Sequence, residues 1–357
     1  MGPRHRRRFE GRGVCRGHVR PALAEIRPDR RADVDTTLSD ARRFYSLGDF
    51  SLECGVTLPA ATLAYATFGS LNAQRDNAIL LPSWYGADYH GYDFLIGAGR
   101  ALDPAKYFLV ATEMFANGFS SSPSNTPPPF DGANFPPIAI RDNVEACHRL
   151  LTRELGVRHL RAVVGLSMGA EQAFQWAVSH PDFVDAIVPY CGTATCYPHG
   201  VVRLESAISA LTADPTKVAW ALHWCAWVWS QEWWRRELFK PQFATVDDVI
   251  AARIATYAPR DPHNMIAQAS MWQRHNVGDT PGFDGDHERA LASIRARVLY
   301  MPSETDLYFP IGDAEYERQF LRDVTFAPIP SLWGHAAGAG ANPADNDFLN
   351  DRIRRFV

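Results

Sequence analysis

The pattern of apolar and polar positions predicts a sheet whose strands alternate with helices. Residues 44–58 and 61–72 alternate apolar and polar side chains around glycine turns, which is typical of an antiparallel hairpin leading into a sheet. Residues 142–155 have the amphipathic period of a helix. Short apolar runs predict further strands at Asn77–Pro82, Lys106–Ala111, His159–Val164, Asp185–Tyr190, Ala296–Met301 and Val324–Ile329. Such alternation predicts an α/β fold with a mostly parallel, doubly wound sheet.

The later middle of the chain has a helical pattern and is rich in tryptophan. Trp220, Trp224 and Trp227 are spaced so that their indoles share one helix face. Such a stripe commonly packs a helix against its neighbours; the alternatives are an apolar acyl pocket or a dimer interface. We therefore predict a core segment at 44–192, an inserted helical cap at 193–292 and a second core segment at 293–357.

The first part of the chain differs from the rest. Residues 1–43 are rich in arginine, glycine and proline and have almost no apolar periodicity. A segment of this composition buries too little apolar surface to fold. We expect residues 1–43 to be a disordered, arginine-rich extension outside the fold, with a transit peptide or basic arm as the alternative.

Composition and charge exclude several classes of function. Apolar content of 46% and charged content of 21% are normal for a soluble globular protein. A net charge of −4 argues against nucleic acid as a partner, and no apolar run is long enough to span a membrane. The six cysteines lack C-x-x-C spacing, which favours reduced, buried thiols over disulfides or a zinc site. We expect a cytoplasmic protein.

The sequence Gly165-Leu166-Ser167-Met168-Gly169 follows an apolar strand and precedes a helical pattern. A G-x-S-x-G motif in this context places the serine on a sharp turn, where small neighbours let the strand and the helix approach closely. The helix N-terminus would then face any oxyanion formed at Ser167. Ser167 is therefore the candidate nucleophile.

A serine nucleophile needs a base and an acid that orients the base. Asp306 lies in the loop after the strand 296–301, at a carboxyl end where open α/β sheets build their sites. His335 follows the last strand and is preceded by Gly334. We predict Asp306 as the acid and His335 as the base. The rivals are a nearby acid, Glu304, and two cap histidines, His263 and His275.

An oxyanion hole requires two backbone N–H donors. One is expected from Met168, the residue after the nucleophile, and the other from the loop after the first long core strand. We assign the second donor to Trp84, with Tyr85 as the alternative.

Several further sequence elements resemble the homoserine O-acetyltransferase branch of the α/β-hydrolase superfamily. They are GAGRALD at 97–103, FPPIAIRDNV at 135–144, GLSMGA at 165–170 and RDPHN at 260–264. The resemblance covers the chain from about residue 44 onwards. It implies an α/β-hydrolase core, a helical lid, a Ser-His-Asp triad and often a homodimer built through the lid.

The chain departs from that branch where the acceptor would bind. Its acetyltransferases usually carry an aspartate directly after the catalytic histidine, which holds the amino group of homoserine. Here Ala336 occupies that position, and an alanine cannot pair with an ammonium group. The loop PSWYG at 82–86 is also bulkier and more aromatic than its counterpart in the family. These differences favour a changed acceptor, of which water is the simplest.

The sequence therefore predicts a serine hydrolase that cleaves an ester, thioester or amide of a small acyl group. An acyl-CoA-dependent acyltransferase with an acceptor other than homoserine is the first alternative, and a non-catalytic binding protein of the same fold is the second. No cofactor or metal is expected. The expected partner is a small acyl substrate, bound by Tyr85, Trp224, Trp227 and Ala336.

Overall fold

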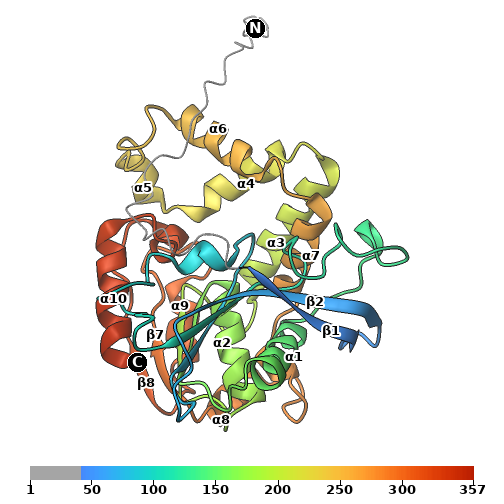
Figure 1. The fold of residues 1–357 in the computed structure, drawn as a ribbon. Coiled ribbons are helices and arrows are strands. Elements are labelled where there is room, and N and C mark those ends of the chain that lie inside the picture. Colours follow the sequence, from blue (N-terminus) through green and yellow to red (C-terminus); the bar gives the residue numbers. More distant parts are fainter. Residues whose placement is uncertain (1–41) are drawn as a thin grey trace, which may run out of the picture. The chain divides into compact units, whose positions relative to one another are not determined.

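The computed structural model describes residues 42–357, and within them eight strands form one sheet. The strand order is β1-β2-β4-β3-β5-β6-β7-β8, and Figure 1 shows the strands at the centre of the fold. The strands are β1 (Arg43–Ser51), β2 (Thr57–Phe68), β3 (Ala78–Pro82), β4 (Phe108–Thr112), β5 (Ala162–Leu166), β6 (Ala186–Tyr190), β7 (Arg297–Tyr300) and β8 (Val324–Phe326).

The pairing of the strands confirms a mostly parallel sheet. The hairpin β1–β2 is antiparallel, with Phe50 opposite Leu58, and β2 also runs antiparallel to β4. From β4 to β8 all neighbours are parallel. Every residue of β3, β4, β5 and β6 is buried. Strands that are buried on both faces must be covered by helices on both sides, as in doubly wound folds.

Helices cover both faces of this sheet. In the described chain α1 packs on α2, and α2 on α8, while Figure 1 shows α10 across the strands from α1. The helices are α1 (Ile140–Arg149), α2 (Met168–Ser179), α3 (Pro198–Ala213), α4 (Val218–Val228), α5 (Gln231–Arg235), α6 (Val246–Tyr257), α7 (Pro262–Gln273), α8 (His287–Ser293), α9 (Ile311–Glu317) and α10 (Pro343–Phe356).

Several predicted boundaries differ from the structure by a few residues, and two of these differences have a local reason. The helix predicted from Asp142 begins at Ile140, because the Asp142 carboxylate accepts the backbone N–H of Ala139 at 2.7 Å and so caps the first turn. Its end is a π-helical turn over Leu150–Glu154. The strand predicted from His159 begins at Ala162, because Leu160 joins the sheet only through an isolated bridge.

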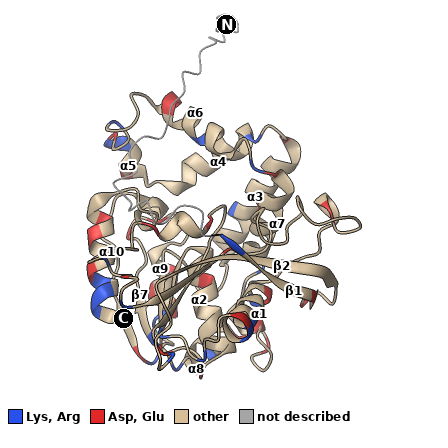
Figure 2. Cartoon of the chain, in the orientation of Figure 1, with Lys and Arg blue, Asp and Glu red and all other residues tan. Residues whose placement is uncertain are grey.

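The chain between β6 and β7 contains the helices α3 to α8. Figure 1 shows α4, α5 and α6 lying together beyond the strand ends. α4 contains no Lys, Arg, Asp or Glu, and its ribbon is accordingly tan in Figure 2. Its Trp220 and Trp224 are buried. The described residues 42–357 belong to one compact unit by their contacts; the cap boundaries at 193 and 292 remain a prediction.

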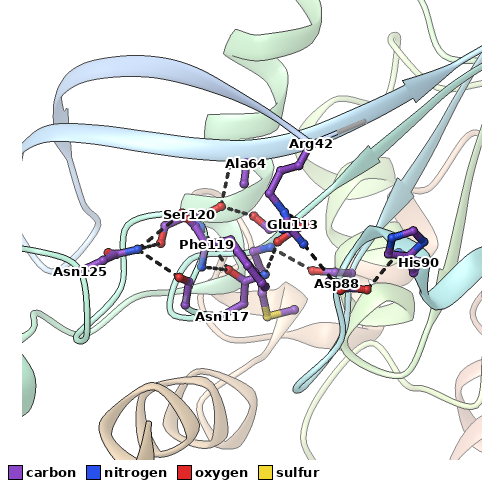
Figure 3. A network of polar contacts seen from close by, with 12 residues as sticks. Arg42, Ala64, Asp88, His90, Glu113, Asn117, Phe119, Ser120 and Asn125 are labelled. Carbon is purple, nitrogen blue, oxygen red and sulfur yellow. Dashed lines mark hydrogen bonds and ion pairs between the residues drawn. The ribbon is translucent and has the colours of Figure 1, made fainter. Parts of the chain in front are cut away.

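The predicted N-terminal extension ends earlier than residue 43. Residues 1–41 lie outside the described residues, but Arg43 opens β1, and Arg42 is held by an ion pair. Its Nε donates to the fully buried carboxylate of Glu113 at 2.8 Å (Figure 3). Burial raises the pKa of Glu113, and the hydrogen bonds from Arg42 and Asn117 act against that rise. The sheet therefore begins at Arg43, and Arg42 is attached to it through the buried carboxylate of Glu113.

No helix in the described residues is both long enough and apolar enough to cross a bilayer. The cysteines of this part of the chain are all free thiols. The prediction that they are buried is wrong for Cys54, which is exposed in the hairpin turn, and Cys196 is half-buried.

The connection between β5 and α2 is a turn that only glycines can build. Ser167 has φ 57° and ψ −122°, a positive φ that is strained for a residue with a side chain. A Cβ at Gly165 would lie 2.0 Å from the carbonyl oxygen of Gly169. A Cβ at Gly169 would lie 2.5 Å from the carbonyl oxygen of Pro82. The strand, the helix and the neighbouring loop are thus in backbone contact around Ser167.

We predict that Gly165→Ala destabilises the protein by at least about 1–3 kcal/mol, because the added methyl overlaps backbone that cannot move. Gly312→Ala in α9 is the matched control: nothing lies within 4 Å of its added Cβ, so it should be neutral or slightly stabilising. Urea unfolding of both variants measures the difference. Equal midpoints for the two would contradict the packing described for the turn.

Candidate active site

Three loops bring the predicted serine, histidine and aspartate into one hydrogen-bonded chain. His335 Nε2 lies 3.0 Å from Ser167 Oγ, and His335 Nδ1 lies 2.8 Å from Asp306 Oδ2. All three side chains are buried, with Ser167 only 1% exposed. This is the geometry in which an imidazole can accept the serine proton while a carboxylate fixes its tautomer.

The loop after β7 holds Asp306 in one orientation. Its Oδ1 accepts the backbone N–H of Tyr308 at 2.7 Å and of Phe309 at 3.2 Å, which leaves Oδ2 for the histidine. The rival Glu304 is exposed, and its backbone N–H pairs with Ile329. The two amide donors lie two and three residues after Asp306, so an Asx-type turn is the signal that could have identified them.

His335 lies in a 3-10 helix, Gly334–Gly338, that packs against the cap. The imidazole lies beside the rings of Tyr308 and Phe309, at centroid distances of 4.7 and 5.6 Å. Gly334 has φ +61°, and a Cβ there would lie 2.8 Å from the backbone nitrogen of Ser230, between α4 and α5. The glycine before the histidine is therefore required both by its backbone conformation and by contact with the cap.

The two rival histidines lie elsewhere. His263 is exposed at the start of α7. His275 is buried, and burial lowers its pKa to about 3. In the hydrogen bonds of the described chain, the Ser167 hydroxyl is paired with His335 and with neither of these.

Two backbone amides are free to stabilise an oxyanion near Ser167. Met168 is the first residue of α2, and Trp84 lies in the loop after β3. Within the described residues neither amide N–H has a hydrogen-bond partner. The Tyr85 amide is also unpaired, whereas that of Gly86 donates to Gln268 Oε1 at 2.9 Å. The assignment between Trp84 and Tyr85 therefore stays as predicted from the sequence.

Tyr92, which the sequence analysis did not single out, connects the two loops that carry these amides. Its buried hydroxyl donates to the carbonyl oxygen of Pro82 at 2.7 Å and accepts the backbone N–H of Leu166 at 3.2 Å. Pro82 ends β3, and Leu166 precedes Ser167. One hydroxyl thus fixes the distance between the Trp84 loop and the nucleophile turn.

A cavity of about 300 Å³ opens beside Ser167 and His335, between the core loops and the cap. Among the described residues that line it, none carries a carboxylate; the polar ones besides Ser167 and His335 include Arg253 and Gln242. Three of the predicted substrate contacts, Tyr85, Trp224 and Ala336, line this cavity. Its other large walls are Trp84, Trp229, Trp233, Phe243, Tyr257 and Trp333.

Trp227, the fourth predicted substrate contact, does not line this cavity. Its half-buried ring packs against His199 and His223, at centroid distances of 5.4 and 6.3 Å. At about 100° per residue, Trp227 lies about 60° around α4 from Trp224. Trp224 instead stacks on Tyr85 at 5.0 Å and so faces the site.

A buried arginine lies behind the acid loop. Arg203, on α3, places its guanidinium over the rings of Tyr308 and Trp272, at 4.1 and 4.5 Å from their centroids. Its three nitrogens have no hydrogen-bond partner among the described residues, and burial lowers its pKa. Contacts of this kind contribute about 0.5–2 kcal/mol. The aromatic wall of His335 is thus supported by a cation that the sequence pattern did not reveal.

Comparison with known proteins agrees with this geometry. Residues 79–341 match the family model of the alpha/beta hydrolase fold. An ethyl acetate hydrolase from Pseudomonas veronii is 36% identical over 87% of this chain and 94% of its own length. A homoserine O-acetyltransferase from Symbiobacterium thermophilum is 28% identical over 86% of this chain and 91% of its own length.

A solved structure has a similar fold over most of both chains. The monoclinic structure of the acetyl esterase MekB has a TM-score of 0.85 and 34% identity, and the match covers 88% of this chain and 96% of that one. The predicted resemblance is confirmed: this chain belongs to the α/β hydrolase family, and its homologues include both esterases and homoserine O-acetyltransferases.

Proposed function

We propose that this protein is a serine esterase that hydrolyses small carboxylic esters, with Ser167 as nucleophile. The observation that carries the proposal is the hydrogen-bonded chain from Ser167 Oγ through His335 to Asp306. The similarity to an ethyl acetate hydrolase and to an acetyl esterase, over most of both chains, supports an ester as the substrate.

The mechanism follows from the positions of the groups. His335 Nε2 accepts the proton of Ser167 as Oγ attacks the ester carbonyl, and Asp306 stabilises the imidazolium that forms. The backbone N–H groups of Met168 and Trp84 donate to the tetrahedral oxyanion. His335 then protonates the leaving alcohol, which leaves an acyl-enzyme. Water, activated by the same imidazole, attacks the acyl group and releases the acid.

Water as the acceptor is supported by the lining of the cavity. Ala336 lies next to the base and contributes no charge, and the described lining contains no carboxylate to hold an ammonium group. An acyltransferase with another acceptor is the second candidate, because a homoserine O-acetyltransferase matches most of the chain. The two activities share the acyl-enzyme and differ in what attacks it.

A homodimer formed through the cap and a cytoplasmic location also belong to this proposal. Cap helices expose several apolar side chains, which supports an interface there. They are those of Val201, Val202, Val218, Leu222 and Val246. Light scattering of the purified protein measures the molecular mass and so decides the oligomeric state.

Replacing Ser167 by alanine should lower kcat for p-nitrophenyl acetate by roughly 10³-fold or more, because no other group can carry the acyl intermediate. Asp306→Asn should cost about as much, because it loses the charge that stabilises the imidazolium. Ser209→Ala, at an exposed position on α3, is the control. A fluorophosphonate should label the wild type and the control but not Ser167→Ala; labelling of all three would point to a different nucleophile and favour a non-catalytic role for this site.

Incubation with acetyl-CoA and homoserine should release acetate without forming O-acetylhomoserine, because no carboxylate in the described cavity lining pairs with the acceptor's ammonium group. Short alcohols serve as a second set of acceptors. Mass spectrometry of the products gives the ratio of transfer to hydrolysis. If the acyl group is transferred to an alcohol faster than acetate is released, the hydrolase assignment is wrong and the acyltransferase is favoured.

The aromatic walls should limit the acyl chain to short lengths. Trp224→Ala enlarges the cavity, and we expect it to raise kcat/KM for p-nitrophenyl hexanoate relative to the acetate. Trp227→Ala removes an equal volume from the same helix outside the cavity and should leave this ratio unchanged. If the two variants shift the chain-length profile equally, Trp224 does not form the acyl wall.

A further inference from the structure

Away from the cavity beside Ser167, α1 and α2 present three side chains of metal-ligating type to one another. Glu145 and His148 lie three residues apart on one face of α1, and His180 is the C-cap residue of α2. One ligand atom from each lies within 4.8 Å of the others. All three residues are half-buried.

We propose that Glu145, His148 and His180 bind a divalent zinc-type ion that joins α1 to α2. The two imidazoles lie parallel, with centroids 4.3 Å apart and planes 7° apart. Neither has a hydrogen-bond partner for its ring nitrogens in the part of the chain that the structure describes. Two imidazoles and a carboxylate, without other partners for the imidazole nitrogens, form a ligand set typical of zinc. Rotation of one ring out of the parallel stack lets the in-plane lone pairs of both imidazoles point at one ion.

Aromatic rings form a wall beside the two imidazoles. The rings of Trp176 and Phe183 lie beside the imidazoles, with centroids 5.1 Å from His180 and His148 respectively. An apolar wall on one side limits hydration and strengthens the bonds to an ion.

Access and charge are also suitable for a cation. A surface cavity of about 300 Å³ is lined by Glu145 and His180, which gives an ion entry and leaves room for water as a further ligand. The carbonyl end of α2 contributes partial negative charge at His180. Arg149 pairs with Oε1 of Glu145 at 2.7 Å and leaves Oε2 for the ion. Arg153 adds positive charge near His148, and the carboxylate of Glu145 acts against it.

Nitrogen-rich ligands of this kind select zinc, cobalt, nickel or copper over magnesium and calcium. The site lies at the far end of α2 from Ser167, about 18 Å away along a helix of this length. An ion there connects two helices beside the sheet without touching the cavity. Its role is therefore to stabilise the fold rather than to take part in ester hydrolysis.

The test is a titration of chelator-treated protein with Co²⁺, followed by its visible absorption, and then displacement by Zn²⁺. We expect one ion per chain and a rise in melting temperature on adding Zn²⁺, with esterase activity unchanged. His148→Ala and His180→Ala should each weaken binding by at least about 100-fold. Glu145→Gln, which changes a half-exposed side chain and leaves packing intact, should also weaken it.

His159→Ala is the matched control, because His159 lies outside the cluster and its imidazole pairs with the carboxylate of Asp185 on the surface. It should bind Co²⁺ as the wild type does. Binding that survives in both His148→Ala and Glu145→Gln would place the ion elsewhere and overturn the proposal, as would the absence of any one-to-one cobalt complex. Circular dichroism identifies a variant that has failed to fold. If a histidine variant has failed to fold, cobalt binding by Glu145→Gln decides whether the ion lies at this site.

Discussion

The structure depends on one close contact, the approach of β5 to α2 at Ser167. Backbone groups are in contact at Gly165 and Gly169. A Cβ at either position would lie 2.0–2.5 Å from a backbone carbonyl oxygen. That contact keeps Ser167 at a positive φ and points the amide end of α2 at the place where negative charge develops. Gly192, just after β6, packs equally closely on the other side of this turn, since a Cβ there would lie 2.6 Å from the Ser167 carbonyl oxygen.

The other groups of the site are arranged around this fixed point by different means. Asp306 is oriented by the two amides that follow it, and His335 by aromatic rings and by a glycine that touches the cap. Tyr92 sets the distance between the loops that supply the oxyanion donors. The catalytic groups are therefore positioned by the core, whereas the walls of the cavity come largely from the cap, with further residues from the loop after β3 and from the segment around His335.

The sequence was informative where a local pattern has a single structural meaning. The motif around Ser167 and the order of Asp306 and His335 after it predicted residues that do come together. The helical face of α4 was less informative, because spacing alone places Trp224 and Trp227 on one side and does not resolve which of them faces the site. Tyr92, Arg203 and the cluster at His180 could not be predicted, since each depends on contacts between segments far apart in sequence.

The contact between Gly334 and Ser230 links the cap to the base. The Ser230 hydroxyl also donates to the carbonyl oxygen of Leu332. The segment between α4 and α5 therefore contacts the loop on both sides of Trp333, at Leu332 and at Gly334. Because the cap and the loop that carries the base are attached at this point, a movement of the cap at that edge would also displace the imidazole from Ser167.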